Sequence, residues 1–331
     1  MSISLIARRV AGAAVLFWLV VTLIFALVRL APGDPATLLV SPSATADDAL
    51  RMRAEFGLDQ PVAVQYARWA ELLLRGNLGD SFALHIPVAR VLADAAPVSL
   101  ALGVASILLT FAIGVPLGLF QAMWRGRIPD RALTTVTAAI FAAPTFWVAL
   151  ALVAFFTYGA VLLGLPATMR LPALGVRTPG VTLAGWDDIA DMARHAILPV
   201  VTLTAVGAAG VARYARSNFV DVLSLDFIRA ARGRGVSRSR MLARHAVGNA
   251  LPSLVVLFAL TLPGVVAGSV FVESVFAWPG LGRLTLTAIA ARDYPVVLGA
   301  GIWYAGAVII ANLIADLILP MLDPRRRERA T

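Results

Sequence analysis

Long runs of apolar residues, separated by shorter polar stretches, dominate this chain of 331 residues. A helix needs about 20 consecutive, mainly apolar residues to cross the hydrocarbon core of a bilayer. Runs that meet or approach this length occur six times, so the pattern predicts six membrane-spanning helices. The predicted spans cover residues 10–28, 98–123, 132–163, 196–212, 251–272 and 296–319. The third run is longer than one span requires, and we expect it to tilt or to end in a surface turn.

The composition supports an integral membrane protein. Hydrophobic residues make up 60% of the chain and charged residues 14%, whereas soluble domains carry about 45–50% and about 25%. A water-soluble fold of this length could not bury so much apolar surface. The first run holds 19 residues without a charge, and no A-x-A site follows it. We therefore interpret it as a retained anchor and not as a cleaved signal peptide.

The basic residues exclude several classes of enzyme. All 28 of them are Arg, and the chain has no Lys. A P-loop needs a Lys to reach the β- and γ-phosphates, protein kinases need their own Lys, and Schiff-base catalysis needs a Lys amine. If ATP drives this protein, another chain must hydrolyse it. The chain also lacks Cys, and its three His have no metal-ligand spacing, so we predict no metal and no cofactor.

The distribution of charge predicts that both termini lie in the cytoplasm. In that orientation the cytoplasmic side carries 17 Arg and five acidic residues, whereas the external side carries 11 Arg and 13 acidic residues. An excess of positive charge in cytoplasmic loops is the usual pattern in membrane proteins. The net charge of +9 is therefore explained by the membrane and its anionic lipids. We expect no nucleic-acid partner.

These observations divide the chain into four parts. They are a cytoplasmic tip with the first span (residues 1–29), an external amphipathic cap (30–97), a five-helix core (98–323) with a long cytoplasmic loop (213–250), and a basic cytoplasmic tail (324–331). In the cap, Thr45 and Asp48 resemble a capping box. Pro61 suits the first turn of a second helix, and Gly57 and Gly76 would end the two helices. Such a cap either seals the bundle or docks a partner.

The cytoplasmic loop is too polar to cross the membrane and too long for a tight turn. Asp226 can cap a short helix that runs to Arg232, and Gly233 and Gly235 would stop it because glycine accepts a positive φ. Ser237 can cap a second helix that leads into the fifth span. Two short helices hinged at glycines form a stiff protrusion that can transmit force. The alternative is an ordinary Arg-rich loop that satisfies the positive-inside rule and contacts anionic lipid.

Within this loop, Arg229-Ala230-Ala231, followed by three residues and then Gly235, resembles the EAA loop of ABC-importer permeases, with Arg in place of the leading Glu. Eight further strings resemble the oligopeptide/dipeptide/nickel branch of that family. They are RLAPGDP (29–35), GLDQPVAVQYARW (57–69), GNLGDSF (76–82), PTFWVAL (144–150), HAILPVVTL (195–203), VFVESVFAWPGLGRL (270–284), RDYPVV (292–297) and DPR (323–325). The ordered set spans nearly the whole chain and resembles the first of the two permease types of this branch.

The resemblance implies an all-α membrane protein, with six transmembrane helices in a type I ABC-importer permease-like bundle and cytoplasmic coupling helices. It implies a non-catalytic subunit that forms half of the pathway for small peptides or a related polar solute, such as nickel or glutathione. The implied partners are a second homologous permease subunit, two ATP-hydrolysing ABC subunits and an external substrate-binding protein. The residues implied at the contact with the ATPase are Asp226, Arg229, Ala230, Ala231, Arg232, Gly233 and Gly235.

Polar residues within or beside the spans are further candidates for function. Asn312 and Asp316 lie four positions apart, on one face of the last predicted span. They either contact the substrate or a cation in the pathway or serve the structure, with Asp316 paired to an Arg of the cytoplasmic loop, and we favour the pairing. Glu273 lies just outside the fifth span. We interpret it as shaping an external re-entrant turn, with a gate as the alternative.

Two other classes of protein compete with an importer subunit. An ion-coupled secondary transporter places several ionisable groups and broken helices near mid-membrane, but only Asp316 falls within a predicted span. An intramembrane enzyme needs a catalytic set of residues, and the chain contains no G-x-S-x-G motif. Uptake that persists without ATP but collapses with the proton gradient would favour the secondary transporter.

Overall fold

The computed structural model describes residues 3–30, 46–55, 57–166, 169–237, 240–267 and 270–322. Over these residues the chain is built from helices and contains no β-strand. Six segments are long and apolar enough to cross a membrane, namely Ala7–Leu30, Val88–Met123, Thr145–Leu162, Trp186–Ser224, Arg244–Gly264 and Tyr294–Ile314. The predicted all-α fold with six transmembrane helices is confirmed.

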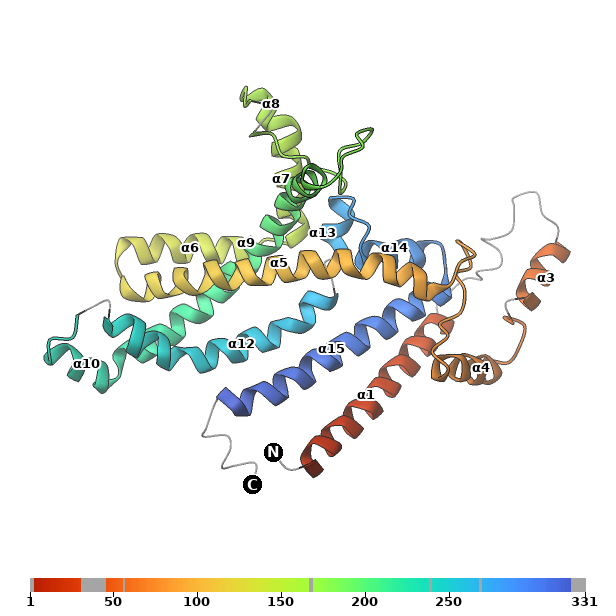
Figure 1. Ribbon diagram of the computed structural model, residues 1–331, viewed down its shortest axis with the longest axis horizontal. Coiled ribbons are helices and arrows are strands. Elements are labelled where there is room, and N and C mark those ends of the chain that lie inside the picture. The colour runs from red at the N-terminus through yellow and green to blue at the C-terminus, as the bar shows by residue number, and fades with distance from the viewer. Residues whose placement is uncertain are drawn as a thin grey trace.

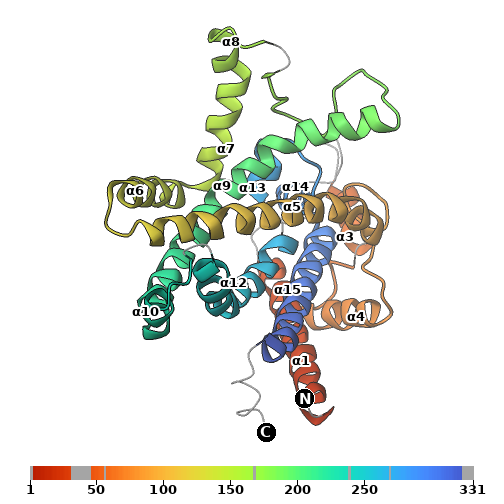
Figure 2. The ribbon, with the colours of Figure 1, turned by 60° about the vertical axis from the view of Figure 1, so that its left-hand side comes forward.

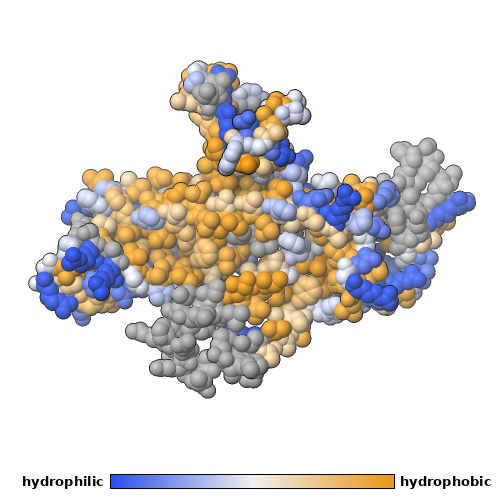
Figure 3. All heavy atoms as spheres, in the orientation of Figure 1, coloured by the Kyte–Doolittle hydropathy of each residue, from blue (hydrophilic) through white to orange (hydrophobic). Residues whose placement is uncertain are grey.

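The long helices pack side by side in a bundle (Figure 1). They are α1 (Ile3–Leu30), α5 (Val88–Met123), α9 (Trp186–Ser224), α12 (Gly248–Ala267) and α15 (Tyr294–Leu322). An apolar band covers the middle of the molecule, and hydrophilic residues gather towards its two ends (Figure 3). One end carries α10 (Asp226–Gly233), and the other carries α3 (Ala46–Glu55) and α4 (Val62–Leu74). The cap and the helix of the predicted cytoplasmic loop therefore lie at opposite ends of the bundle.

The third predicted span is not one continuous helix, so that part of the prediction is wrong. This region consists of α6 (Ile128–Ala142), α7 (Thr145–Ala154), a π-helical turn (Phe155–Gly159) and α8 (Ala160–Leu162). Between α6 and α7, Ala143 and Pro144 are extended, with ψ of 130° and 132°. Proline has no backbone N–H and pushes the residue before it out of the helical region. The chain bends there, and α7 projects from the bundle (Figures 1 and 2).

The fourth predicted span is much too short. α9 contains 39 residues, whereas the hydropathy pattern predicts a helix over 196–212 only. The helix begins at Trp186, in a stretch assigned to an external loop, and ends at Ser224, inside the loop predicted for 213–250. A helix can continue beyond the bilayer with polar residues, because water and ions solvate them there. The first part of the predicted cytoplasmic loop is thus a helical extension of α9.

Helices α5 and α9 approach closely where α5 carries Gly114 and Gly118 four positions apart. A Cβ on Gly118 would lie 2.6 Å from the carbonyl oxygen of Ala212 and 2.6 Å from the Cβ of Ala215. A Cβ on Gly114 would lie 2.8 Å from the Cβ of Val211. Small residues at this spacing let membrane helices pack backbone against backbone. This contact fixes α5 against α9 over more than one helical turn.

The cap helix α4 packs on α1 through aromatic rings. The ring of Phe25 on α1 lies 5.3 Å from that of Tyr66 and 5.1 Å from that of Trp69, between centroids. The hydroxyl groups of Tyr66 and Thr22 form a hydrogen bond of 2.8 Å. Edge-to-face and offset ring pairs at such distances add to the burial of apolar area. The cap is therefore fastened to the first span.

The two helices predicted for the cap are present. Gly57 and Gly76 follow α3 and α4 and adopt positive φ angles of +63° and +74°. The backbone N–H of Asn77 donates to the carbonyl of Leu72 at 2.9 Å. This hydrogen bond is typical of a helix that ends at a glycine. Thr45, the first residue of the predicted capping box, lies outside the described residues.

Candidate functional site

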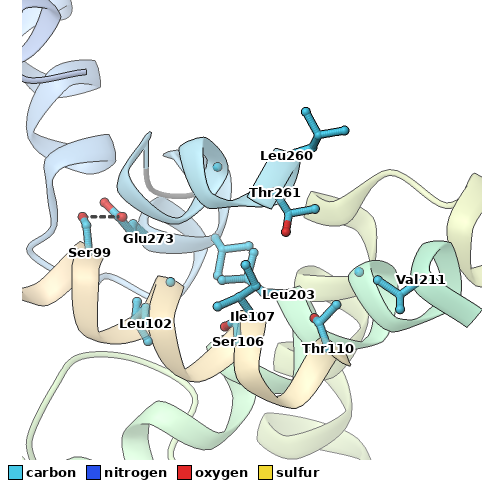
Figure 4. Close-up of a pocket in the computed structure, with 14 residues that line it drawn as sticks. Ser99, Leu102, Ser106, Ile107, Thr110, Leu203, Val211, Leu260, Thr261 and Glu273 are labelled. Atoms are coloured by element: carbon cyan, nitrogen blue, oxygen red, sulfur yellow. Dashed lines mark hydrogen bonds between the residues drawn. The ribbon is translucent and has the colours of Figure 1, made fainter. Parts of the chain in front are cut away.

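A partly open cavity of about 460 Å³ lies between α5, α9, α12 and α13 (Val270–Val275) (Figure 4). Its polar lining residues are Ser99, Ser106, Thr110, Thr261 and Glu273, and the other lining residues are aliphatic or glycine. The Oγ atom of Ser106 is buried and has no hydrogen-bond partner among the described residues. The cavity therefore presents hydroxyl groups on an otherwise apolar wall.

Glu273 sits at one end of this cavity, and the structure shows what its carboxylate holds. The side chain is 1% exposed and accepts hydrogen bonds from the Ser99 hydroxyl at 2.7 Å and from the backbone N–H groups of Gly282 and Arg283 at 2.7 and 3.1 Å. The two backbone donors belong to the first turn of α14 (Leu281–Ala290). The positive end of the α14 dipole also stabilises a carboxylate at this position. Glu273 thus joins α13, α14 and α5.

Glycines next to this carboxylate make the contact possible. A Cβ on Gly280 would lie 2.5 Å from the Oε2 atom of Glu273, and one on Gly282 would lie 2.9 Å from it. The string that contains Glu273, Gly280 and Gly282 therefore encodes a tight connection between two short helices. The charge of Glu273 is satisfied by three donors, so the cavity offers a solute no free carboxylate among its described residues.

The structure does not place Asn312 at this cavity. Asn312 and Asp316 both lie in α15, and the side chain of Asn312 is exposed on the surface of the helix. Asn312 does not line the cavity. The side chain of Asp316 lies outside the described part of the chain. A pairing of Asp316 with an Arg of the cytoplasmic loop therefore stays a prediction.

The predicted coupling residues lie on and just after α10, at the polar end of the bundle. Ile228 and Ala231 are 0% and 1% exposed, and the ring of Phe227 lies 6.5 Å from that of His245 in the π-helical segment Met241–Val247. Asp226 and Arg229 form an exposed ion pair on the outer side of α10, and Ala230 beside them is exposed as well. One face of α10 is thus fixed to the protein, and the other is free for contact.

The ends of α10 differ in detail from the prediction. Leu225 precedes the helix with ψ of 148°, and its carbonyl accepts the N–H of Ile228 at 3.1 Å. Asp226 is thus the first residue of the helix and not its cap. Gly235 adopts the positive φ, +77°, and a Cβ on it would meet nothing within 4 Å. Gly233 is the last residue of α10. The side chain of Arg232 lies outside the described residues.

A buried ion pair that sequence reasoning missed joins the first turn of α6 to α9. Asp130 is 2% exposed, and Arg216 donates to both of its oxygens at 2.7 and 2.8 Å. The backbone N–H of Gly126 adds a bond of 2.8 Å. These bonds, first of all that from Arg216, lower the pKa of Asp130 to about 2. The sequence offered one signal for this pair, namely a single acidic residue in an Arg-rich segment.

A second missed contact joins two of the strings on which the family resemblance rests. Asp293, in RDYPVV, accepts a hydrogen bond from the hydroxyl of Ser81, in GNLGDSF. The backbone N–H groups of Phe82 and Ala83 donate to the same carboxylate at 3.1 and 3.2 Å. Asp293 is 3% exposed. The loop that follows the cap is thereby tied to the beginning of α15.

A six-span helical bundle with a hydroxyl-lined cavity, whose one carboxylate is already bonded, and with an exposed helix at one end is the arrangement expected of a membrane transport subunit. Residues 114–328 match the family described as the binding-protein-dependent transport system inner membrane component. Residues 2–103 match the N-terminal membrane component of the same systems. The chain belongs to this family of ABC-importer permeases.

Individual relatives cover almost the whole chain. The probable peptide ABC transporter permease protein y4tP of Sinorhizobium fredii is 34% identical over 322 residues, 97% of this chain and 98% of that protein. The oligopeptide transport system permease protein AppB of Bacillus subtilis is 34% identical over 91% of this chain and 92% of that protein. The glutathione transport system permease protein GsiC of Salmonella typhimurium is 34% identical, with 97% of each covered.

The fold resembles a solved ABC transporter. An inward-facing structure of the MetNI methionine ABC transporter matches 71% of this chain and 97% of its own chain, with a TM-score of 0.51 and 19% sequence identity. This similarity concerns the fold alone and agrees with the predicted type I permease bundle.

Membership of the family establishes the role of the chain. It is a multi-pass inner-membrane permease subunit of an ATP-driven importer, and it is not an enzyme. Separate ATPase subunits hydrolyse ATP, and a substrate-binding protein is a further partner. The ion-coupled alternative is not supported, because these systems are driven by ATP.

Proposed function

We propose that this chain imports small peptides, or the related solute glutathione, and forms one half of the pathway beside a second homologous permease subunit. The cavity of about 460 Å³ carries this proposal, because its polar groups are hydroxyls and its one carboxylate is already bonded. Hydroxyls both donate and accept hydrogen bonds, as neutral peptide groups require. Nickel, a further solute of the branch, prefers imidazole and related ligands, which the described lining residues do not supply.

Filling the cavity tests this proposal. The importer would be assembled from this chain, its second permease, its ATPases and its binding protein, and uptake of tri- to pentapeptides and of glutathione into proteoliposomes would be measured with ATP. Ser106→Phe places a ring in the cavity and should abolish uptake while the complex still assembles. Thr287→Phe, at an exposed position of α14, is the matched control. Unchanged uptake by Ser106→Phe would contradict the proposal.

We place the contact with the ATPase subunits, one beneath each permease, on α10 and the glycines that follow. The exposed residues Asp226, Arg229 and Ala230 face the partner, whereas buried Ile228 and Ala231 hold the helix on the bundle. Closure of the ATPases on nucleotide would draw two such helices together and open the pathway outward, and hydrolysis would let it reopen inward. This is alternating access between two states. Arg232, Gly233 and Gly235 complete the proposed contact.

Single cysteines test the contact, because the chain has no Cys of its own. Ala230→Cys on α10 should cross-link to a cysteine in the groove of the ATPase. Ala63→Cys, exposed on α4 of the cap, should not. Failure of Ala230→Cys to cross-link in an assembly that hydrolyses ATP would remove α10 from the interface.

We further propose that both termini and α10 are cytoplasmic and that the cap is external. The cap and α10 lie at opposite ends of the bundle, so one measurement orients both. A membrane-impermeant maleimide added to intact spheroplasts should label Ala63→Cys and spare Ala230→Cys. The reverse labelling would invert the orientation.

A further inference from the structure

A second cavity, of about 560 Å³, lies between the cap and the bundle and shares no lining residue with the central cavity. Its walls come from the end of α1, from α4, from the loop after α4 and from the first turns of α15. Cavities of this size hold small ligands in many proteins. It lies at the end of the molecule that carries the cap, far from α10.

Arg29 gives this cavity a charge that the described residues do not neutralise. Its guanidinium carbon lies 5.4 Å from the ring centre of Phe25 and 5.5 Å from that of Tyr294. The two rings hold the guanidinium by cation–π contact. The Nε atom is buried and has no hydrogen-bond partner, and Arg29 has no ion-pair partner in the described part of the chain. Arg68 adds a second positive charge to the lining, against one carboxylate, that of Asp80.

Gln65, on α4, contributes an acceptor in the same cavity. Its Nε2 atom donates to the carbonyl of Gln60 at 2.7 Å, which fixes the orientation of the side-chain amide. Its Oε1 atom is buried without a hydrogen-bond partner. A buried donor on Arg29 and a buried acceptor on Gln65 each carry a desolvation penalty until a partner arrives. The partner that satisfies both must accept at one atom and donate at another.

We propose that this cavity binds the carboxyl-terminal end of a linear peptide on its way into the importer. The terminal carboxylate accepts from the planar fork of Arg29, and the last amide N–H of the peptide donates to Oε1 of Gln65. The terminal side chain lies against Trp69 and Leu298, which also line the cavity. A bare carboxylate would satisfy Arg29 but leave Gln65 without a donor. This inference rests on the proposed peptide import and names the part of the peptide that is recognised.

Uptake of trialanine and of trialanine amide by the complete importer tests the inference. Wild type should prefer the free acid, and Arg29→Gln should lower the acid-to-amide uptake ratio at least tenfold. Arg29→Lys, which keeps the charge but not the fork, should fall between them. Arg75→Gln is the matched control, because Arg75 pairs with Glu71 on the exposed surface beside α4 and lies outside the cavity. The same binding protein serves every variant, so a changed ratio reports the permease. An unchanged ratio in Arg29→Gln would overturn the inference and leave peptide import standing.

Direct binding separates this inference from the proposed function. The complex of permease and ATPase subunits in nanodiscs, without the binding protein, would be dialysed against radiolabelled trialanine. Wild type and Arg75→Gln should bind it saturably, Arg29→Gln should not, and unlabelled trialanine amide should fail to compete. Equal binding by Arg29→Gln, or no saturable binding by wild type at millimolar peptide, would overturn the inference. Absence of any peptide uptake by wild type would instead contradict the proposed function. Basal ATP hydrolysis and size-exclusion profiles confirm that each variant assembles.

Discussion

Asp130→Asn removes the charge from a buried ion pair while preserving the size of the side chain. In the folded protein the two hydrogen bonds from Arg216 and the N–H of Gly126 lower the pKa of Asp130 from an ordinary 3.8 to about 2. That difference corresponds to about 2 kcal/mol of stabilisation at neutral pH. Arg216 is 30% exposed, so water compensates part of its loss, and the effect stays below the roughly 3–5 kcal/mol of fully buried pairs. We expect the free energy of unfolding to fall by about 2 kcal/mol.

The same pair predicts a pH dependence of definite sign. Because the pKa of Asp130 is lower in the folded state than in the unfolded state, its contribution is complete above about pH 4. It is lost as the pH falls towards about 2, where the folded protein also takes up the proton. Asp130→Asn has no such proton to bind. The difference in stability between wild type and variant should therefore shrink between pH 4 and pH 2.

Unfolding in mixed micelles with increasing dodecyl sulfate, followed by the fluorescence of the seven Trp residues, measures both effects. Asp226→Asn is the matched control, because it breaks an Asp–Arg pair whose side chains are 92% and 72% exposed, and exposed pairs contribute little. It should unfold like wild type. If Asp130→Asn also unfolds at the wild-type detergent fraction at pH 7, the ion pair does not stabilise the fold and the reasoning is refuted.

Three other substitutions have expected outcomes. Gly235→Pro cannot adopt the φ of +77°, since proline is fixed near −65°; it should leave membrane insertion intact but raise the ATP hydrolysed per solute imported, and normal accumulation would defeat the assignment. Gly118→Leu should separate α5 from α9 and abolish assembly on size exclusion, whereas Gly12→Leu, whose Cβ would meet nothing within 4 Å, should assemble normally. Glu273→Gln loses the charge that holds Gly282 and Arg283 and should cost about 1–3 kcal/mol; limited proteolysis should cleave the α13–α14 connection faster, and an unchanged rate would show that the charge is dispensable.

Hydropathy identified the segments that cross the membrane, and glycine positions identified the ends of α3 and α4, because both signals are local. The break at Pro144 was also local, but an average over apolar residues does not register a missing backbone donor. The length of α9 was missed for a related reason. Polar residues in a helix outside the bilayer have the same hydropathy as residues in a loop.

The contacts that organise the site could not be predicted from the sequence, for a different reason. Asp130 and Arg216 are 86 positions apart in sequence, and Ser81 and Asp293 are 212 positions apart. A single sequence contains no measure of which distant positions meet. The strings that carry Ser81 and Asp293 were recognised as family features, yet their pairing with each other required the fold.

The uninterrupted length of α9 has a mechanical consequence. Its 39 residues make a rod of about 58 Å at about 1.5 Å per residue, and α10 follows directly at its foot. A rod of that length converts a tilt of about 10° at one end into a displacement of about 10 Å at the other. A pull on α10 would therefore move the opposite end of α9 by up to about the width of a peptide, with Pro199, which lacks a backbone N–H, as a position inside the helix where it can bend.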